Sequence, residues 1–447
     1  MTKTKLLTLC IFIVQLTVNG QVFTLKQCLQ YANDNNKNIK IAYYEKEIAR
    51  EQVREQVGTG LPQISATGTI TDNVKLATSL MPGALFGQPG TYIPIQTGVQ
   101  YNTAAAVKLS QKVFDAGFWV GLKAATISGQ LKQQDIQKTV EQTTYDVSNA
   151  YYQSLIIQKE LDSYKATLVA SEKSLASTEL KFRNGKVKKV DVDKIRVSYN
   201  NTKSQVQQTE LSYKQSLNTL KFKIGMPVDS AIVLADTMLV DFSTDDYISP
   251  SNGFVENRVD YQLQKTNLQI QEAQKQKNIA DFFPTLTFDA NYSFQAMDNN
   301  LKLFNSGQNW YQSSYIDLSL NVPIFSGFQR TSKVEQARLN VMEAEENLKL
   351  TEQSIKVEVS NYEIQYKNAI DNIKNEKENL ALAESVYNNT QLEFQQGAAS
   401  SLELIQAESS YREAQNSYFN KLLTLYVARL DVEKSKGSLM NFINNLK

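Results

Sequence analysis

The sequence predicts a mainly α-helical chain with four β-strands, built from a duplicated unit of helix, strand, strand, long helix and shorter helix. Three observations predict this fold class. Long stretches contain neither Gly nor Pro, which favours long helices. Four short segments alternate between apolar and polar residues, which is the period of a strand with one apolar and one polar face. The same order of elements occurs twice along the chain.

The composition excludes several kinds of function. The 447 residues carry a formal net charge of +1, from 47 basic and 46 acidic side chains, so nothing favours nucleic acid as a partner. Histidine is absent, which removes His-based triads and His metal sites. The sequence also has no Gly-rich phosphate loop and no cluster of metal ligands. We therefore expect no enzyme activity, no cofactor and no metal.

Residues 1–20 have the pattern of a secretory signal peptide. Two lysines precede Leu6–Val18, an apolar stretch that is too short to span a bilayer. Small or permissive residues before Gln21 predict cleavage there, and a buried N-terminal helix is the alternative. Cleavage leaves Cys28 as the one cysteine of the mature chain, so we expect no internal disulfide.

The first structural repeat is predicted at residues 21–226. It starts with a helix whose N-cap is Thr24, and a run of Asn and Asp divides this helix into a shorter and a longer piece. Alternation then predicts strands at about 63–76 and 101–114, separated by a Gly- and Pro-rich loop at 81–98.

A long helix and a shorter helix follow the strands of the first repeat. Residues 130–184 lack Gly and Pro, and Gly185 ends this helix. A shorter helix follows at 187–224. Residues 227–252 are mixed in character and are predicted to form a linker or equatorial segment.

The second structural repeat is predicted at residues 253–447. A helix at 254–283 leads to strands at about 285–295 and 315–325. The next Gly- and Pro-free stretch ends at Gly397 and predicts a helix of up to ~70 residues, or ~100 Å at 1.5 Å per residue. A shorter helix follows. The halves align without a gap around the helix breaks, where Phe182 matches Phe394, Gly185 matches Gly397, Asp191 matches Glu403 and Tyr199 matches Tyr411.

The strands indicate a membrane. They are about ten residues long and alternate apolar with polar side chains, which is the signature of a transmembrane β-barrel wall. In the last strand the predicted lipid-facing residues are Ile316, Leu318, Leu320, Val322 and Ile324. Four strands are too few to close around a lumen, so closure requires several chains, and three chains give twelve strands. An antiparallel coiled coil with no further role stays an alternative, because the helices keep apolar residues at steps of three and four.

Aromatic residues gather where predicted strands meet long helices. They are Phe114, Phe118, Trp119, Phe282, Phe283, Phe325 and Phe328. Aromatic rings are favoured at membrane interfaces, because they are apolar and tolerate the headgroup region. We therefore predict that they form a membrane-interface girdle, with ordinary core aromatics at a domain junction as the alternative.

Several features together resemble the TolC-type outer-membrane efflux and export channels. They are the two-fold duplication, the helix-to-strand junctions L-P-Q and F-F-P, the segment P-I-F-S-G-F before a long helix, and an F-x-x-G helix break in each half. The resemblance covers nearly the whole mature chain. It implies a homotrimer whose twelve-stranded β-barrel lies in the outer membrane of a Gram-negative bacterium and continues into an α-helical periplasmic barrel.

The resemblance also implies partners and a role. The channel would dock to a periplasmic adaptor (membrane fusion) protein and an inner-membrane pump, contact outer-membrane lipid, and act as the passive exit duct of a tripartite efflux or secretion system. The cargo and the pump class stay open. A periplasmic coiled-coil adaptor or structural spacer protein is the alternative, but it leaves the amphipathic strands unexplained.

In this family the helix break forms the periplasmic entrance of the channel. Two acidic residues one helical turn apart narrow that entrance. The first position corresponds to Glu403, whereas the second falls on Gln406. The first repeat has Asp191 and Lys194 at the matching positions, beside further lysines. We hypothesise that three Glu403 side chains form a cation-favouring constriction. The alternative is that Glu403 and Asp191 only stabilise helix N-termini.

The two helix-break glycines also have two interpretations. The resemblance implies that the hairpins at Gly185 and Gly397 dock the adaptor. Each glycine is also expected to be a left-handed C-cap, which needs no partner.

Overall fold

The computed structural model describes residues 21–235, 254–301 and 307–445. The predicted signal peptide and part of the predicted segment 227–252 lie outside the described residues. Each of two compact units takes segments from both halves of the sequence. The sheet unit comprises Glu45–Gln133 and Gln264–Leu348, and the helical unit comprises Met1–Tyr44, Gln134–Leu263 and Lys349–Lys447. The repeat boundaries themselves stay a prediction.

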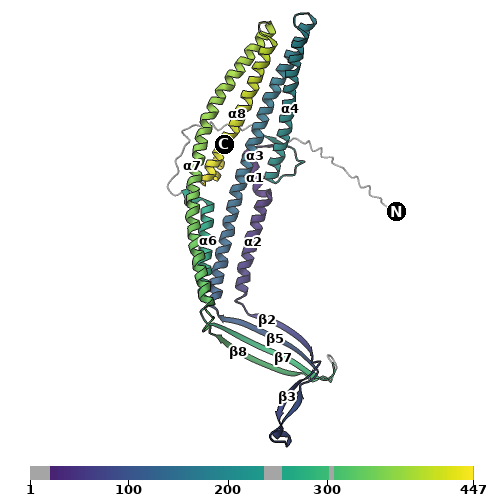
Figure 1. Cartoon of the computed structure of the whole chain (residues 1–447), viewed down its shortest axis with the longest axis vertical. Helices are drawn as coiled ribbons and strands as arrows, with labels where there is room; N and C mark the ends of the chain where they lie inside the picture. The colour runs from purple at the N-terminus through teal and green to yellow at the C-terminus, as the bar shows by residue number, and fades with distance from the viewer. Residues whose placement is uncertain (1–20, 236–253, 302–306, 446–447) are drawn as a thin grey trace, which may run out of the picture. The chain divides into compact units, whose positions relative to one another are not determined.

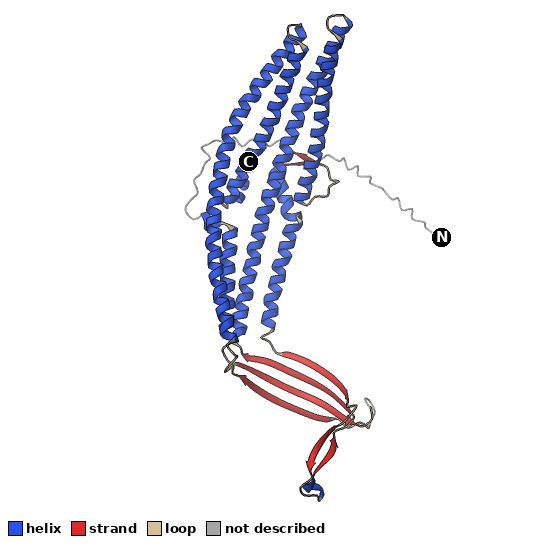
Figure 2. Cartoon of the chain, in the orientation of Figure 1, coloured by secondary structure: helices blue, strands red, loops and turns tan. Residues whose placement is uncertain are grey.

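A four-stranded antiparallel sheet is the main feature of the sheet unit (Figures 1 and 2). Its strands are β2 (Gln63–Asp72), β5 (Tyr101–Phe114), β7 (Thr285–Asp298) and β8 (Tyr311–Asn321). They are hydrogen-bonded in the order β2-β5-β7-β8. Two strands from each half of the sequence therefore share one sheet, and β2 and β8 form its edges.

Two strand ends differ from the prediction. β2 ends at Asp72 instead of near 76, because Asn73 turns the chain and its backbone N–H donates to the Gln100 carbonyl oxygen at 2.7 Å. β8 starts and ends four residues earlier than the predicted 315–325. It stops before Pro323, which has no N–H to donate to a neighbouring strand.

The predicted loop at 81–98 is wrong. β3 (Ala77–Pro82) and β4 (Tyr92–Thr97) pair as an antiparallel hairpin, and the 3₁₀ helix η1 (Gly83–Phe86) follows β3. Figure 1 shows this hairpin at the end of the sheet away from the helix junctions. Most of the Gly and Pro residues that indicated a loop lie in the connection between the strands, so composition hid two short strands.

Each of the four strands of this sheet is adjacent along the chain to one long helix. These helices are α2 (Lys37–Gly58), α3 (Ala116–Arg183), α6 (Val259–Ala280) and α7 (Gln329–Gln396). α3 starts at Ala116, not at residue 130 as predicted, and it continues through three glycines. A glycine weakens a helix interior by about 1 kcal/mol. Gly121 leaves room for a side chain of α2, because a Cβ atom there would lie 2.9 Å from the Gln56 Nε2 atom.

The helical unit holds the remaining elements together with parts of the longer helices. They are α1 (Leu25–Asn35), α4 (Lys189–Ile224), α5 (Phe254–Asn257), α8 (Ser401–Ser435), α9 (Leu439–Asn445) and the parallel strands β1 (Gln21–Phe23) and β6 (Ile232–Leu234). Thr24 caps α1, as predicted. The first helix divides at Asn36, whose side chain accepts backbone N–H groups of α2. The predicted helix 254–283 is interrupted at the buried Arg258, whose guanidinium donates to the Lys434 carbonyl oxygen at 2.6 Å.

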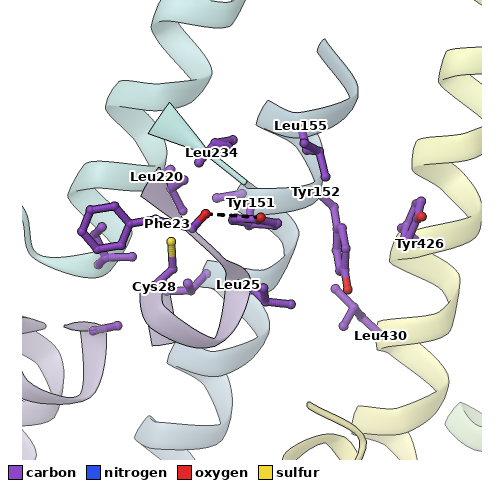
Figure 3. Close-up of a cluster of buried hydrophobic side chains, with 14 of the residues drawn as sticks. Phe23, Leu25, Cys28, Tyr151, Tyr152, Leu155, Leu220, Leu234, Tyr426 and Leu430 are labelled. Atoms are coloured by element: carbon purple, nitrogen blue, oxygen red, sulfur yellow. Dashed lines mark hydrogen bonds between the residues drawn. The ribbon is translucent and has the colours of Figure 1, made fainter. Parts of the chain in front are cut away.

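The core of the helical unit gathers described segments from near both ends of the chain around α3 (Figure 3). Tyr151 is fully buried, and its hydroxyl donates to the carbonyl oxygens of Ala235 at 3.0 Å and Phe23 at 3.4 Å. Tyr152 stacks on Tyr426 of α8 with ring centroids 4.5 Å apart. Helices from both halves of the sequence therefore share one core. Within the described residues, no helix is long and apolar enough to cross a membrane.

Candidate functional site

The hairpins α3–α4 and α7–α8 end in turns of the same backbone geometry (Figure 1). Gly185 has φ +71° and Gly397 has φ +83°, the left-handed region that glycine enters without strain. The Gly185 N–H donates to the Phe182 carbonyl oxygen at 2.9 Å, and the Gly397 N–H donates to that of Phe394 at 3.1 Å. Both glycines are therefore C-caps. Their docking role stays a prediction.

Residues 181–196 are named the first tip below, and residues 393–408 the second tip. Glu403 starts α8 in the second tip, where its Oε2 atom accepts from the Ser400 N–H at 2.6 Å. The Glu403 N–H donates to the Ser400 Oγ atom at 3.3 Å, which completes a capping box. These bonds to Ser400 hold the pKa of the Glu403 carboxyl below its ordinary value. The exposed carboxylate therefore stays ionised at neutral pH.

Asp191 occupies the matching position in α4, and it contacts the second tip. Its Oδ2 atom accepts from the Lys188 N–H at 3.2 Å, and its Oδ1 atom accepts from the Ser401 hydroxyl at 2.8 Å. Lys194 and Gln406 lie one turn further along their helices and are exposed. The structure thus brings Asp191 to the second tip. The place of these residues in a constriction stays a prediction.

Lys181 forms a second link between the tips that the sequence did not reveal. Its ammonium donates to the carbonyl oxygens of Phe394 at 2.6 Å and Gln395 at 3.0 Å. It also lies 4.9 Å from the centroid of the Phe394 ring. A cation at a helix C-terminus satisfies carbonyl groups that have no partner in the helix. Lys181 of α3 therefore stabilises the end of α7.

Glu408 is a third link, and it is buried. Only 3% of its surface is exposed, and its carboxylate accepts from the Ser198 hydroxyl at 3.0 Å and the Thr202 hydroxyl at 2.7 Å. A buried carboxylate needs such partners, because desolvation is costly. One sequence signal points to it: Glu408 follows the buried Leu404 by one helical turn, so a charge occupies the apolar seam of α8.

The sheet has one apolar and one mostly polar face. The apolar face carries Ile64, Ala66, Gly68 and Ile70 of β2, Thr103, Ala105, Val107 and Leu109 of β5, Leu286, Phe288, Ala290, Tyr292 and Phe294 of β7, and Ile316, Leu318 and Leu320 of β8. Thr103, Gln111, Gln312 and Ser314 are uncharged polar exceptions on it, and Asp72 and Asp298 lie on it at the strand ends away from the helices. In a single chain this face is open, since Ile316 is 76% exposed and Leu320 64%. Of the predicted lipid-facing residues, Val322 and Ile324 lie beyond the end of β8.

Charged residues in the middle of the strands lie on the opposite face. The Lys108 ammonium is 3.1 Å from the Asp289 carboxylate. Asp317 lies directly across from Asp289 in the pairing of β7 with β8, and it accepts from the Ser319 hydroxyl at 2.7 Å. An apolar face and a charged face on one sheet is the arrangement of a wall between lipid and water.

The predicted girdle aromatics lie at the strand ends that join the helices. Phe118 and Trp119 contact edge to face with centroids 5.2 Å apart, and Phe325 and Phe328 do so at 5.7 Å. The Phe118 ring covers Gly60, where a Cβ atom would lie 2.5 Å from it. The remaining rings, Phe114, Phe282 and Phe283, are about half exposed. Contact of these rings with a membrane interface stays a prediction.

No group of three or more His, Cys, Asp or Glu side chains is placed to hold a metal ion in the part of the chain that the structure describes.

Comparisons with known proteins agree with this geometry. Residues 28–226 and 256–438 match the family model described as outer membrane efflux protein. The chain is 22% identical over 446 residues to outer membrane protein TolC of Escherichia coli (strain K12), covering 94% of this chain and 83% of that protein. It is 21% identical over 340 residues to TolC of Vibrio cholerae serotype O1, covering 75% of this chain and 77% of that protein.

Solved structures share the fold at low identity. The outer membrane protein VceC of Vibrio cholerae superposes with a TM-score of 0.72 at 16% identity, covering 92% of this chain and 96% of that chain. The CmeC outer membrane channel of Campylobacter jejuni gives 0.73 at 16% identity, covering 95% of this chain and 89% of that chain.

Proposed function

This chain belongs to the outer membrane efflux protein family, and from that premise we propose that it is the exit duct of a tripartite efflux or secretion system. In this role cargo passes through it passively, across the periplasm and the outer membrane, without a catalytic step. The chain is an outer-membrane efflux channel, and the family is one of channels.

One observation supports the proposal most strongly, and it is the two-faced sheet. All four strands put apolar side chains on one face and most of their polar and charged side chains on the other. Burying that apolar face against lipid removes a large exposed area of Ile, Leu and Phe from water. The polar face then lines the lumen.

The edges of the sheet support closure by three copies. β2 and β8 each pair on one side only within the described chain, so each leaves a row of backbone groups without a strand partner. Such groups cost several kcal/mol each in a bilayer unless another strand pairs with them. Pairing β8 of one copy with β2 of the next closes a barrel, and three chains give twelve strands.

The tips supply the periplasmic end of the duct in this proposal. Three Glu403 carboxylates form a cation-favouring ring, with Gln406, Asp191 and Lys194 beside them. The caps at Gly185 and Gly397 present both hairpins to a periplasmic adaptor, which connects the duct to an inner-membrane pump.

Replacing Glu403 by Gln in a planar bilayer tests the entrance. Loss of cation preference supports a constriction at Glu403. Unchanged selectivity together with unchanged conductance removes the constriction and leaves Glu403 as a helix cap.

A periplasmic adaptor or structural spacer is the second candidate, and the long helices favour it. Washing outer membranes with alkaline carbonate separates the two, because the wash strips peripheral proteins and leaves barrels in the bilayer. Retention in the membrane and step-like conductance after reconstitution support the duct. Release by the wash supports the spacer.

A further inference from the structure

The two tips have the same backbone but opposite charge. The first tip carries seven basic and two acidic residues, a net charge of +5, whereas the second tip carries no basic and three acidic residues, a net charge of −3. The tips also share an exposed apolar position, since Val190 and Leu402 are 51% and 63% exposed, and the residues directly before the tips, Leu180 and Leu392, are 60% and 56% exposed. Shape and apolar contact are therefore matched, and charge distinguishes the tips.

Four cations of the first tip are free for an outside partner. Three of the seven are engaged within the chain: Lys181 binds carbonyl oxygens, Lys189 lies 3.3 Å from Asp193, and Arg196 lies 2.7 Å from Glu179. The other four, Arg183, Lys186, Lys188 and Lys194, are exposed, and their side chains form no ion pair among the described residues.

The acidic residues of the tips do not account for these cations. Glu403 accepts from the Ser400 N–H, and Asp191 accepts from the Lys188 N–H and the Ser401 hydroxyl. Glu408 is buried and bonded to hydroxyl groups. These three acidic groups are thus bonded without the four free cations, and Asp193 pairs with Lys189 instead. Four like charges within residues 183–194 repel one another until a partner neutralises them.

We propose that the first tip docks a carboxylate-rich segment of a protein partner, whereas the second tip docks through apolar contacts alone. The proposal rests on the proposed function, in which both tips face a periplasmic adaptor. It adds the chemistry of that partner and makes the two docking sites of one chain unequal. A ring of partner subunits then fits the duct in one register, because a half-step rotation sets carboxylates against the acidic second tip.

A peptide-binding experiment on the full-length, detergent-purified channel tests this. The probe is a peptide of ten glutamates, measured at low salt, and the variant carries Lys186→Gln, Lys188→Gln and Lys194→Gln. We expect roughly tenfold weaker binding than wild type, because each exposed ion pair contributes modestly. Binding by the wild type should also weaken as salt is raised.

A matched control removes the same charge elsewhere. It carries Lys367→Gln, Lys374→Gln and Lys377→Gln, three exposed lysines of α7 away from the tips. We expect this control to bind the peptide like wild type. Equal losses in both variants, or no loss in the tip variant, would overturn the proposal.

Two further measurements separate the alternatives. Tighter binding of the wild type to phosphatidylglycerol vesicles than to the peptide, lost in the tip variant, would assign the first tip to a lipid surface and overturn the proposal. Bilayer conductance of the same preparations reports on the duct. If the wild-type channel conducts normally but the tip variant binds the peptide as tightly as wild type, the docking proposal fails while the proposed function stands.

Discussion

Replacing Ile316 by Arg tests which face of the sheet meets lipid. Ile316 is the middle residue of β8 (Tyr311–Asn321), and its side chain is 76% exposed on the apolar face. An arginine facing lipid at the midplane of a barrel costs about 2–4 kcal/mol, against about 0–1 kcal/mol near an interface. Three copies per assembly raise the cost to roughly 6–12 kcal/mol. We therefore expect little or no assembled trimer.

Two variants of the same strand calibrate this result. Ser319→Arg puts the same side chain on the polar face, and we expect it to assemble like wild type. Leu320→Arg lies on the apolar face but one residue before the strand end, so we expect a smaller loss than for Ile316→Arg. The assay is the trimer yield in outer-membrane fractions on unheated gels. Normal assembly of Ile316→Arg, or an equal loss for Ser319→Arg, would refute the assignment of the faces.

Three other predictions concern the tips. Hydrogen bonds from Ser400 lower the pKa of the Glu403 carboxyl. We therefore expect the part of the cation selectivity that Glu403 supplies to persist as the pH is reduced to about 5, near the ordinary range of a glutamate, and to be lost only below the depressed pKa. Loss of that selectivity above about pH 6 in bilayer recordings would contradict this. Gly397→Ala should lower the thermal midpoint, since left-handed backbone costs a non-glycine residue about 1 kcal/mol, whereas Gly129→Ala inside α3 should leave it unchanged or raise it. Glu408→Ala should destabilise the helical unit by about 2–4 kcal/mol, because two hydroxyl groups lose a charged acceptor in a buried site; a change below about 0.5 kcal/mol in denaturant unfolding would contradict that role.

Elements with a strict period were predictable from the sequence. A strand with one apolar face repeats every two residues, so the four strands of the sheet were found with errors of a few residues at their ends. Absence of Gly and Pro identified α7, which ends before Gly397 as expected. Both signals are local, and both are carried by many consecutive residues.

Elements that depend on tertiary contact were not predictable in this way. The start of α3 was placed after its glycines, because propensity alone does not reveal that Gly121 lies against Gln56 of α2. β3 and β4 were hidden by the Gly and Pro residues of the turn between them.

The sequence predicted which positions form the two tips, but it did not predict the hydrogen bonds between them. The duplication identified Asp191 and Glu403 as equivalent, and both start helices beyond a glycine cap. The contact of Asp191 with Ser401, and that of Lys181 with Phe394, join residues more than 200 positions apart. No local pattern encodes such pairs, because they depend on how two hairpins pack.

Cross-linking the two sheet edges tests the central claim, closure of one duct by three chains, most directly. Single cysteines at Thr67 or Thr69 of β2 are combined with one at Ser319 of β8, and the protein is oxidised in the membrane; the native Cys28 is buried and should not interfere. The account predicts a covalent trimer on a non-reducing gel, with no larger species. Monomer alone from every pair, or a ladder that continues beyond three chains, would contradict it.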